Sequence, residues 1–96
     1  MNNIRFQWDQ NKNVANIKKH KVSFEEAKTV FFDENARLIP DPEHSINEER
    51  FIILGISNKL KLLIVVHLYK SNDEVIRIIS ARKATKSEIK YYDEVK

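Results

Sequence analysis

Three basic side chains, Arg50, His67 and Arg77, lie in successive β-rich runs joined by short polar connections. A two-residue turn at Asn58-Lys59 would place Arg50 opposite His67, because the length of a hairpin loop sets the register of its strands. A three-residue turn at Ser71 to Asp73 would likewise place His67 opposite Arg77. The sequence therefore predicts a basic row across three strands, with opposed Cβ atoms about 5 Å apart.

Such a row is suited to binding an anion. Neighbouring cations repel one another, the planar fork of arginine matches phosphate, and a lowered histidine pKa would leave a neutral imidazole able to accept a proton. These properties fit RNA cleavage through attack by a 2′-hydroxyl. The alternative is that the arginines pair with carboxylates of the segment Glu43 to Glu49, or extend to the rim of the sheet.

Other kinds of chemistry find little support in the sequence. There is no cysteine, and His20, His44 and His67 are scattered without metal-ligand spacing. Neither a glycine-rich phosphate loop nor a serine nucleophile elbow is present. We therefore expect no metal and no cofactor.

The elements that would position these residues follow the order β-α-α-β-β-β-β-α. Five runs have strand character: Ile4 to Trp8, Ala36 to Ile39, Arg50 to Ile56, Lys61 to Tyr69 and Val75 to Arg82. Helices are expected between Asp9 and His20, from Ser23 to about Asp33, and after Thr85. Because the helices group early and the strands late, we predict an α+β fold with an antiparallel β-sheet and helices packed on it.

Capping residues mark where each helix begins. Asp9 is a candidate N-cap, and Ser23 to Glu26 and Thr85 to Glu88 have the spacing of capping boxes, in which the glutamate reaches back to the cap amide. Pro40 and Pro42 should stop the second strand, because proline cannot donate to a sheet ladder.

Apolar spacing predicts which side chains face the core. In the helices, the inward set is Val14, Ile17, Phe24, Ala27, Val30, Phe31, Ile89, Tyr92 and Val95. In the strands, the register described above predicts a core side made of Phe51, Ile53, Leu62, Ile64, Val66, Ile76 and Ile78.

Composition is typical of a small domain that needs no disulfides. With 96 residues and no cysteine, the chain is expected to form one domain over residues 1–96 and to be cytoplasmic. No apolar signal region follows Met1, and the longest apolar run, Leu62 to Val66, is too short for a bilayer, so no membrane association is expected.

Charge is distributed unevenly along the chain. The net charge is +3, with about +4 before Ser23, −5 from Ser23 to Arg50 and +4 after it. Basic surface from both ends of the chain could attract nucleic acid, although an ordinary solvated surface explains the same counts.

Beyond these patterns, the sequence resembles the BrnT toxin family over nearly its whole length. The matching residues are Trp8-Asp9, Lys12, Asn16, Lys19-His20, Val22, Ser23 to Ala27, Phe31, Asp33, Asp41, His44, Glu49-Arg50, Gly55, Val66-His67, Ile76 to Thr85, Glu88 and Tyr92. One departure is Lys21, where the family usually has glycine.

The resemblance implies a RelE-like ribonuclease toxin that cleaves RNA and inhibits translation. It also implies a BrnA-type antitoxin, held in a hetero-oligomer, which alone would contact operator DNA. On this hypothesis Arg77 and Arg82 hold phosphate, His67 transfers a proton and Arg50 is a supporting cation. Arg82 also precedes a helix N-terminus, where backbone amides favour phosphate.

Further roles have structural alternatives. Tyr92 would transfer a second proton or position substrate, or be a core aromatic with a hydrogen-bonded hydroxyl. Lys19, His20 and Lys83 would bind RNA, although a basic helix end also stabilises the helix dipole. For the whole protein, the alternatives are a non-catalytic RNA- or ribosome-binding module that acts by occupancy, and a structural subunit of a heterocomplex.

Overall fold

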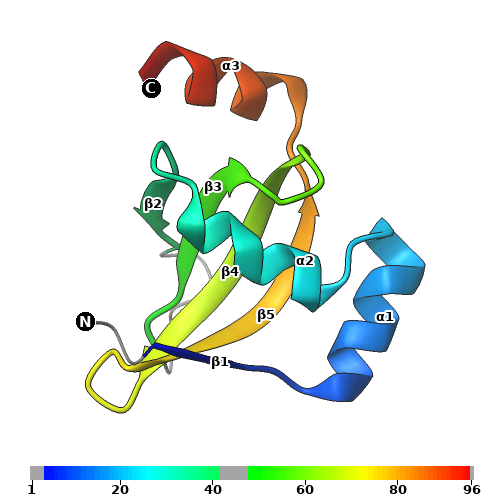
Figure 1. Ribbon diagram of the computed structural model, residues 1–96, viewed down its shortest axis with the longest axis vertical. Coiled ribbons are helices and arrows are strands. Elements are labelled where there is room, and N and C mark those ends of the chain that lie inside the picture. The colour runs from blue at the N-terminus through cyan, green and yellow to red at the C-terminus, as the bar shows by residue number, and fades with distance from the viewer. Residues whose placement is uncertain (1–3, 42–47, 96) are drawn as a thin grey trace.

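The computed structural model describes residues 4–41 and 48–95, and shows the predicted α+β class (Figure 1). Pro42, His44 and the rest of Glu43 to Asn47 lie outside the described residues, as does the side chain of Val95. The elements are β1 (Arg5–Gln7), α1 (Gln10–His20), α2 (Phe24–Thr29), the 3-10 helix η1 (Val30–Phe32), β2 (Arg37–Pro40), β3 (Phe51–Ile56), β4 (Leu62–Lys70), β5 (Val75–Lys83) and α3 (Lys86–Val95).

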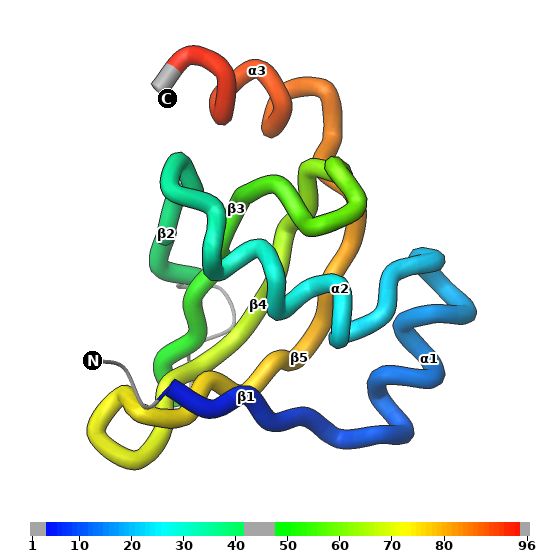
Figure 2. Tube along the Cα trace, in the orientation of Figure 1, coloured from blue at the N-terminus to red at the C-terminus, as the bar shows by residue number. Residues whose placement is uncertain are grey.

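The five strands form one mixed sheet in the order β1-β5-β4-β3-β2. The pairs β2-β3, β3-β4 and β4-β5 are antiparallel, whereas β1 runs parallel to β5, with Arg5 beside Val75 and Gln7 beside Arg77. The prediction of a wholly antiparallel sheet is therefore wrong at this edge. No hairpin turn constrains the direction of β1, because it pairs with a strand far away in the sequence (Figure 2).

Helices cover the two faces of the sheet unequally. On one face α2 crosses the strands and α1 packs beside β5, over the main core (Figure 1). That core contains Val22, Phe24, Ala27, Val30, Ile53, Leu63, Val65, Ile78 and Ala81. On the other face, Tyr92 of α3 packs on Leu54 and Ile64 at one end of the sheet.

All three predicted helix starts show capping bonds, and those of Thr85 at the start of α3 involve Glu88. The Asp9 carboxylate accepts from Lys12 N at 3.1 Å, and Ser23 Oγ accepts from Glu26 N at 3.0 Å. The second bond of the Ser23 capping box, from Ser23 N to the Glu26 carboxylate, is not seen. Glu26 is buried, and its carboxylate accepts from Ser57 Oγ at 2.7 Å. Glu26 therefore ties α2 to the end of β3 instead of completing its own cap.

The inward face of α1 differs from the prediction. Val14 and Ile17 are 50% and 41% exposed, whereas Asn13 and Asn16 are buried. Asn16 Nδ2 donates to the carbonyls of Val22 and Ala81, both at 2.8 Å, and its Oδ1 accepts from Ala81 N at 3.1 Å. A side-chain amide can satisfy such backbone groups and an aliphatic side chain cannot, which places the asparagines inside.

Lys21, the departure from the family pattern, is the C-cap of α1. Its φ of 62° lies in the left-handed region that favours glycine, and its N–H donates to Ile17 O. Glycine is the residue that adopts this conformation without steric cost. Lys21 therefore keeps the helix end that glycine usually provides, at a cost of about 1 kcal/mol in backbone strain.

The predicted stripe of the second helix is confirmed for Phe24, Ala27 and Val30, which are fully buried. Gly55 of β3 allows η1 to approach the sheet, because a Cβ there would lie 2.9 Å from Val30 Cγ1. Strand and helix backbones can come this close only where no side chain intervenes.

Candidate functional site

The observed strand register changes the predicted basic row. In β3 and β4, Phe51 and not Arg50 pairs with His67, and in β4 and β5 His67 pairs with Ile78 and not Arg77. The first hairpin closes with Ser57 N donating to Lys61 O, which leaves a three-residue loop with Leu60 in the left-handed region. Each predicted loop was one residue too short, so the placement of His67 between the two arginines is wrong.

His67 lies in the core, on the face covered by α2. It is 0% exposed, and its ring centroid is 4.7 Å from that of Phe31 in an edge-to-face contact. Burial lowers the pKa of His67 from 6.5 to about 4, which the hydrogen bond with Val65 O opposes only in part. A neutral imidazole was expected, but its cause is burial and not neighbouring arginines.

Arg50 and Arg77 nevertheless stay on one face of the sheet, because the two register errors cancel. Leu68 pairs with Arg77, and continuing the β3-β4 register by one residue sets Arg50 beside Leu68. The two arginines are thus two strands apart, or about 10 Å. Arg77 Nη1 donates to Gln7 Oε1 at 2.9 Å across the parallel pair.

The predicted alternative of carboxylate pairing applies to Arg50, whose Nη2 lies 3.3 Å from Glu48 Oε1. This pair is partly exposed, so the ion pair by itself contributes little to stability.

A hollow of about 360 Å³ opens on this sheet face, away from α2. Four of its lining residues are apolar, and the other four carry guanidinium, hydroxyl or carboxylate groups. The lining residues are Asp41, Arg50, Ile52, Ile64, Val66, Ile79, Ser80 and Arg82. Asp41 and Ser80 were not among the predicted site residues, although both belong to the BrnT-like pattern, which was the signal available for finding them.

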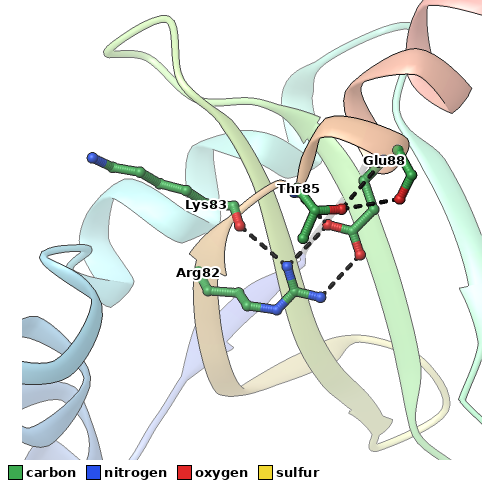
Figure 3. Close-up of polar contacts among 5 residues, drawn as sticks. Arg82, Lys83, Thr85 and Glu88 are labelled. Carbon is green, nitrogen blue, oxygen red and sulfur yellow. Dashed lines mark hydrogen bonds and ion pairs between the residues drawn. The ribbon is translucent and has the colours of Figure 1, made fainter.

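Arg82 is held at the hollow by a bidentate ion pair (Figure 3). Its Nη1 and Nη2 donate to Glu88 Oε1 and Oε2, both at 2.9 Å, and Nη1 also donates to Lys83 O at 3.1 Å. The hydrogen bond from Arg82 lowers the pKa of Glu88 to about 2, and the same bond raises the pKa of Arg82. Both groups therefore stay charged near neutral pH.

Tyr92 serves to attach α3 in this structure. Its side chain is buried, and its hydroxyl donates to Asp33 Oδ2 at 2.6 Å. Asp33 Oδ2 also accepts from Ile56 N at 2.9 Å, so one carboxylate joins α3 to β3. Burial, reinforced by Asp33, raises the pKa of Tyr92 to about 12, so near neutral pH the phenol stays protonated and is a weak proton donor.

Three predicted RNA-binding residues lie apart from the hollow. Lys19 and His20 end α1, and none of the residues that line the hollow comes from that helix. Lys83 follows Arg82 on β5, but its exposed side chain extends away from the guanidinium (Figure 3). The structure therefore brings Arg50 and Arg82 together, and leaves Lys19, His20 and Lys83 outside the hollow.

A larger hollow of about 590 Å³ near the end of β4 is less suited to a polyanion. Glu48, Glu49 and Asp73 line it, with Lys70 as a cation. Within residues 4–41 and 48–95, no three His, Asp or Glu side chains are grouped so that they could hold a metal ion. No helix in that part of the chain is long and apolar enough to cross a membrane.

Comparisons with known proteins agree with the pattern in the sequence. The family model "Ribonuclease toxin, BrnT, of type II toxin-antitoxin system" matches residues 8–88. Among solved structures, the crystal structure of the Brucella abortus ribonuclease toxin BrnT is similar in fold, with a TM-score of 0.67 and 24% sequence identity. The match covers 86% of this chain and 99% of that one. The search among curated proteins found no match.

Proposed function

This chain belongs to the BrnT family of ribonuclease toxins of type II toxin-antitoxin systems, and from that premise we propose that it cleaves RNA at the hollow lined by Arg50, Ser80 and Arg82. We further propose that cleavage needs no metal and that a BrnA-type antitoxin, which alone contacts operator DNA, neutralises it. The RelE-like assignment and the cytoplasmic location stay predictions.

One observation carries the proposal: Arg82 of β5 and Arg50, which directly precedes β3, both line a hollow whose other lining residues are largely apolar. Arginine binds phosphate with parallel N–H donors, and a site walled by apolar side chains strengthens such contacts. The scissile phosphate would lie between Arg50 and Arg82. Ser80 would donate a hydrogen bond to a phosphate oxygen.

The reaction we propose is transfer of the phosphodiester to the neighbouring 2′-oxygen. The 2′-oxygen forms a bond to phosphorus as its proton passes to a base, the bond from phosphorus to the 5′-oxygen breaks, and the 5′-oxygen takes up a proton from water. The arginines stabilise the charge that builds up on the phosphate oxygens. This leaves a 2′,3′-cyclic phosphate and a 5′-hydroxyl.

Asp41 is our candidate acceptor for the 2′-hydroxyl proton, since its carboxylate lines the hollow beside Arg50. His67 is buried behind the sheet and the Tyr92 hydroxyl donates to Asp33, so neither is included in the proposed proton transfer. Arg77, on the same face, would contact a neighbouring phosphate of the strand.

The test is to incubate purified protein with bacterial RNA in excess EDTA and to map new 5′ ends and cyclic phosphates. We expect cleavage to persist, and Arg82→Ala or Arg50→Ala to lower its rate roughly 100-fold. Lys28→Ala is the matched control, because Lys28 is a paired cation on α2, over the opposite sheet face. Its rate should match the wild type.

Two results would count against the proposal. Inhibition by EDTA that one divalent ion reverses would show a metal-dependent reaction. RNA binding without cleavage would favour the occupancy module, in which the same basic face blocks translation without cutting.

A further inference from the structure

Glu88 performs two structural tasks with one carboxylate (Figure 3). Its Oε1 accepts from Thr85 N at 2.8 Å, while Thr85 Oγ1 accepts from Glu88 N at 3.3 Å, which completes the capping box of α3. Both of its oxygens also accept from Arg82. The start of α3 is thereby joined to the arginine that lines the hollow.

The ion pair with Glu88 uses some of the N–H donors of Arg82 and leaves others for a ligand. Arginine has five N–H donors, and the bonds to Glu88 and Lys83 O use two on Nη1 and one on Nη2. The remaining donors are Nε–H and the second N–H of Nη2, which lie parallel on one edge of the guanidinium. Two parallel donors of this kind match two oxygens of a phosphate.

We propose that Glu88 is a positioning residue, which holds the end of the Arg82 guanidinium so that its Nε–Nη2 edge is presented to the RNA phosphate. This inference rests on the proposed ribonuclease function. Arg82 is 40% exposed and has a long flexible side chain, so without Glu88 it would sample many orientations. A fixed orientation matters for catalysis because small displacements of a charge-stabilising group cost rate.

A different reading is that Glu88 only stabilises α3. Thr85 separates the two readings, because its hydroxyl takes part in the cap but not in the pair with Arg82. Thr85→Ala should weaken the start of α3 while leaving the ion pair in place. Glu88→Gln, which removes the carboxylate charge, should weaken both.

The experiment is a double-mutant cycle on an RNA oligonucleotide that spans a site cleaved by the wild type. The variants are Glu88→Gln, Arg82→Ala and their combination, with Thr85→Ala as the control for helix capping. The cleavage rate constant kcat is measured for each, and the dissociation constant Kd is measured on the same oligonucleotide with 2′-deoxy at the cleaved position. Thermal melting reports the stability of every variant.

We expect Glu88→Gln to lower kcat about tenfold or more while Kd changes less than about threefold. Thr85→Ala should stay within about twofold of the wild type, and Glu88→Gln should have no further effect once Arg82 is alanine. The inference is overturned if Glu88→Gln leaves kcat unchanged, if Thr85→Ala lowers it equally, or if Glu88→Gln lowers it as much without Arg82.

Failure of the proposed function gives a different result. If the wild type binds RNA but does not cut it, the ribonuclease proposal is wrong, and the same cycle is then read on Kd. If Glu88→Gln weakens RNA binding when Arg82 is present but not when it is alanine, the positioning role of Glu88 is still supported. Equal Kd values for RNA in all variants would refute that role.

Discussion

At the scale of single residues, His67 shows how burial can give a histidine a structural role. A neutral tautomer with Nδ1–H donating to Val65 O at 3.1 Å and Nε2 accepting from the Tyr69 hydroxyl at 3.3 Å satisfies both ring nitrogens. Phe31 and Phe51 lie against the same ring. These contacts favour the neutral form, so His67 should stabilise the fold when it is uncharged.

This leads to a prediction about pH. The pKa of His67 is lowered from 6.5 to about 4, so between these values the unfolded chain binds a proton that the folded protein does not. Stability from this group is therefore complete above pH 6.5 and is lost as the pH falls. We expect the free energy of unfolding to decrease by about 2 kcal/mol between pH 6.5 and 5.

Urea unfolding of the wild type and of His67→Leu at several pH values measures this effect. His67→Leu should lack the decrease between pH 6.5 and 5 and should retain RNA cleavage. Equal pH dependence in the two proteins would assign the effect to other groups. Loss of cleavage with the fold preserved would restore His67 as a catalytic candidate.

At the scale of elements, one asparagine attaches α1 to the sheet. Asn16 bonds both the carbonyl and the amide of Ala81 in β5, and also the carbonyl that follows the α1 C-cap, that of Val22. The side-chain amide thus makes the two hydrogen bonds to Ala81 that a neighbouring strand would make, beyond the point where β1 ends. The position of α1 against β5 depends on this polar contact more than on an apolar stripe.

We therefore expect Asn16→Ala to destabilise the protein by about 2 to 4 kcal/mol, because it leaves buried backbone groups without partners. Asn11→Ala, at an exposed position of the same helix, should change stability by less than about 0.5 kcal/mol. Urea unfolding with the slope m compared between variants gives both values. A small effect of Asn16→Ala would mean that water or a shifted α1 satisfies Ala81.

At the scale of the whole molecule, the fold gathers basic groups from separate parts of the chain on one sheet face. Arg50 lies in the acidic middle segment of the sequence, but the sheet places it with Arg77 and Arg82 of the basic C-terminal part. The chain as a whole carries a net charge of +3. We propose that this face attracts RNA, and that an antitoxin denies RNA access to it.

The corresponding prediction concerns the kinetics of antitoxin binding. Raising salt from about 0.05 to 0.3 M should slow association of toxin and antitoxin much more than it speeds their dissociation. Opposite charges on the two proteins mainly accelerate their encounter, and salt screens these charges. Arg77→Glu should slow association further, whereas the control Lys28→Glu on α2 should not. Rate constants from surface plasmon resonance test this, and an association rate independent of salt would contradict the proposed face.

Several features could be derived from the sequence because they depend on neighbours along the chain. The Asp9 and Thr85 caps, the buried stripe of Phe24, Ala27 and Val30, and the α+β class follow from local spacing. The BrnT resemblance is confirmed by the family match over residues 8–88. Local hydrogen bonds and helical periodicity are sufficient for these features.

The register of the sheet, and with it the site, was decided only in the tertiary structure. Residues with a left-handed backbone conformation are typical of hairpin loops, and glycine is the residue that usually identifies them in a sequence. Here Leu60 and Ser71 to Asp73 adopt this conformation, and the single glycine lies in β3. The predicted length of each loop was therefore one residue too short. β4 is apolar on both faces, so alternation could not correct the error. Long-range packing therefore placed His67 in the core, left Arg50 and Arg77 on the same face and joined Asn16 to Ala81.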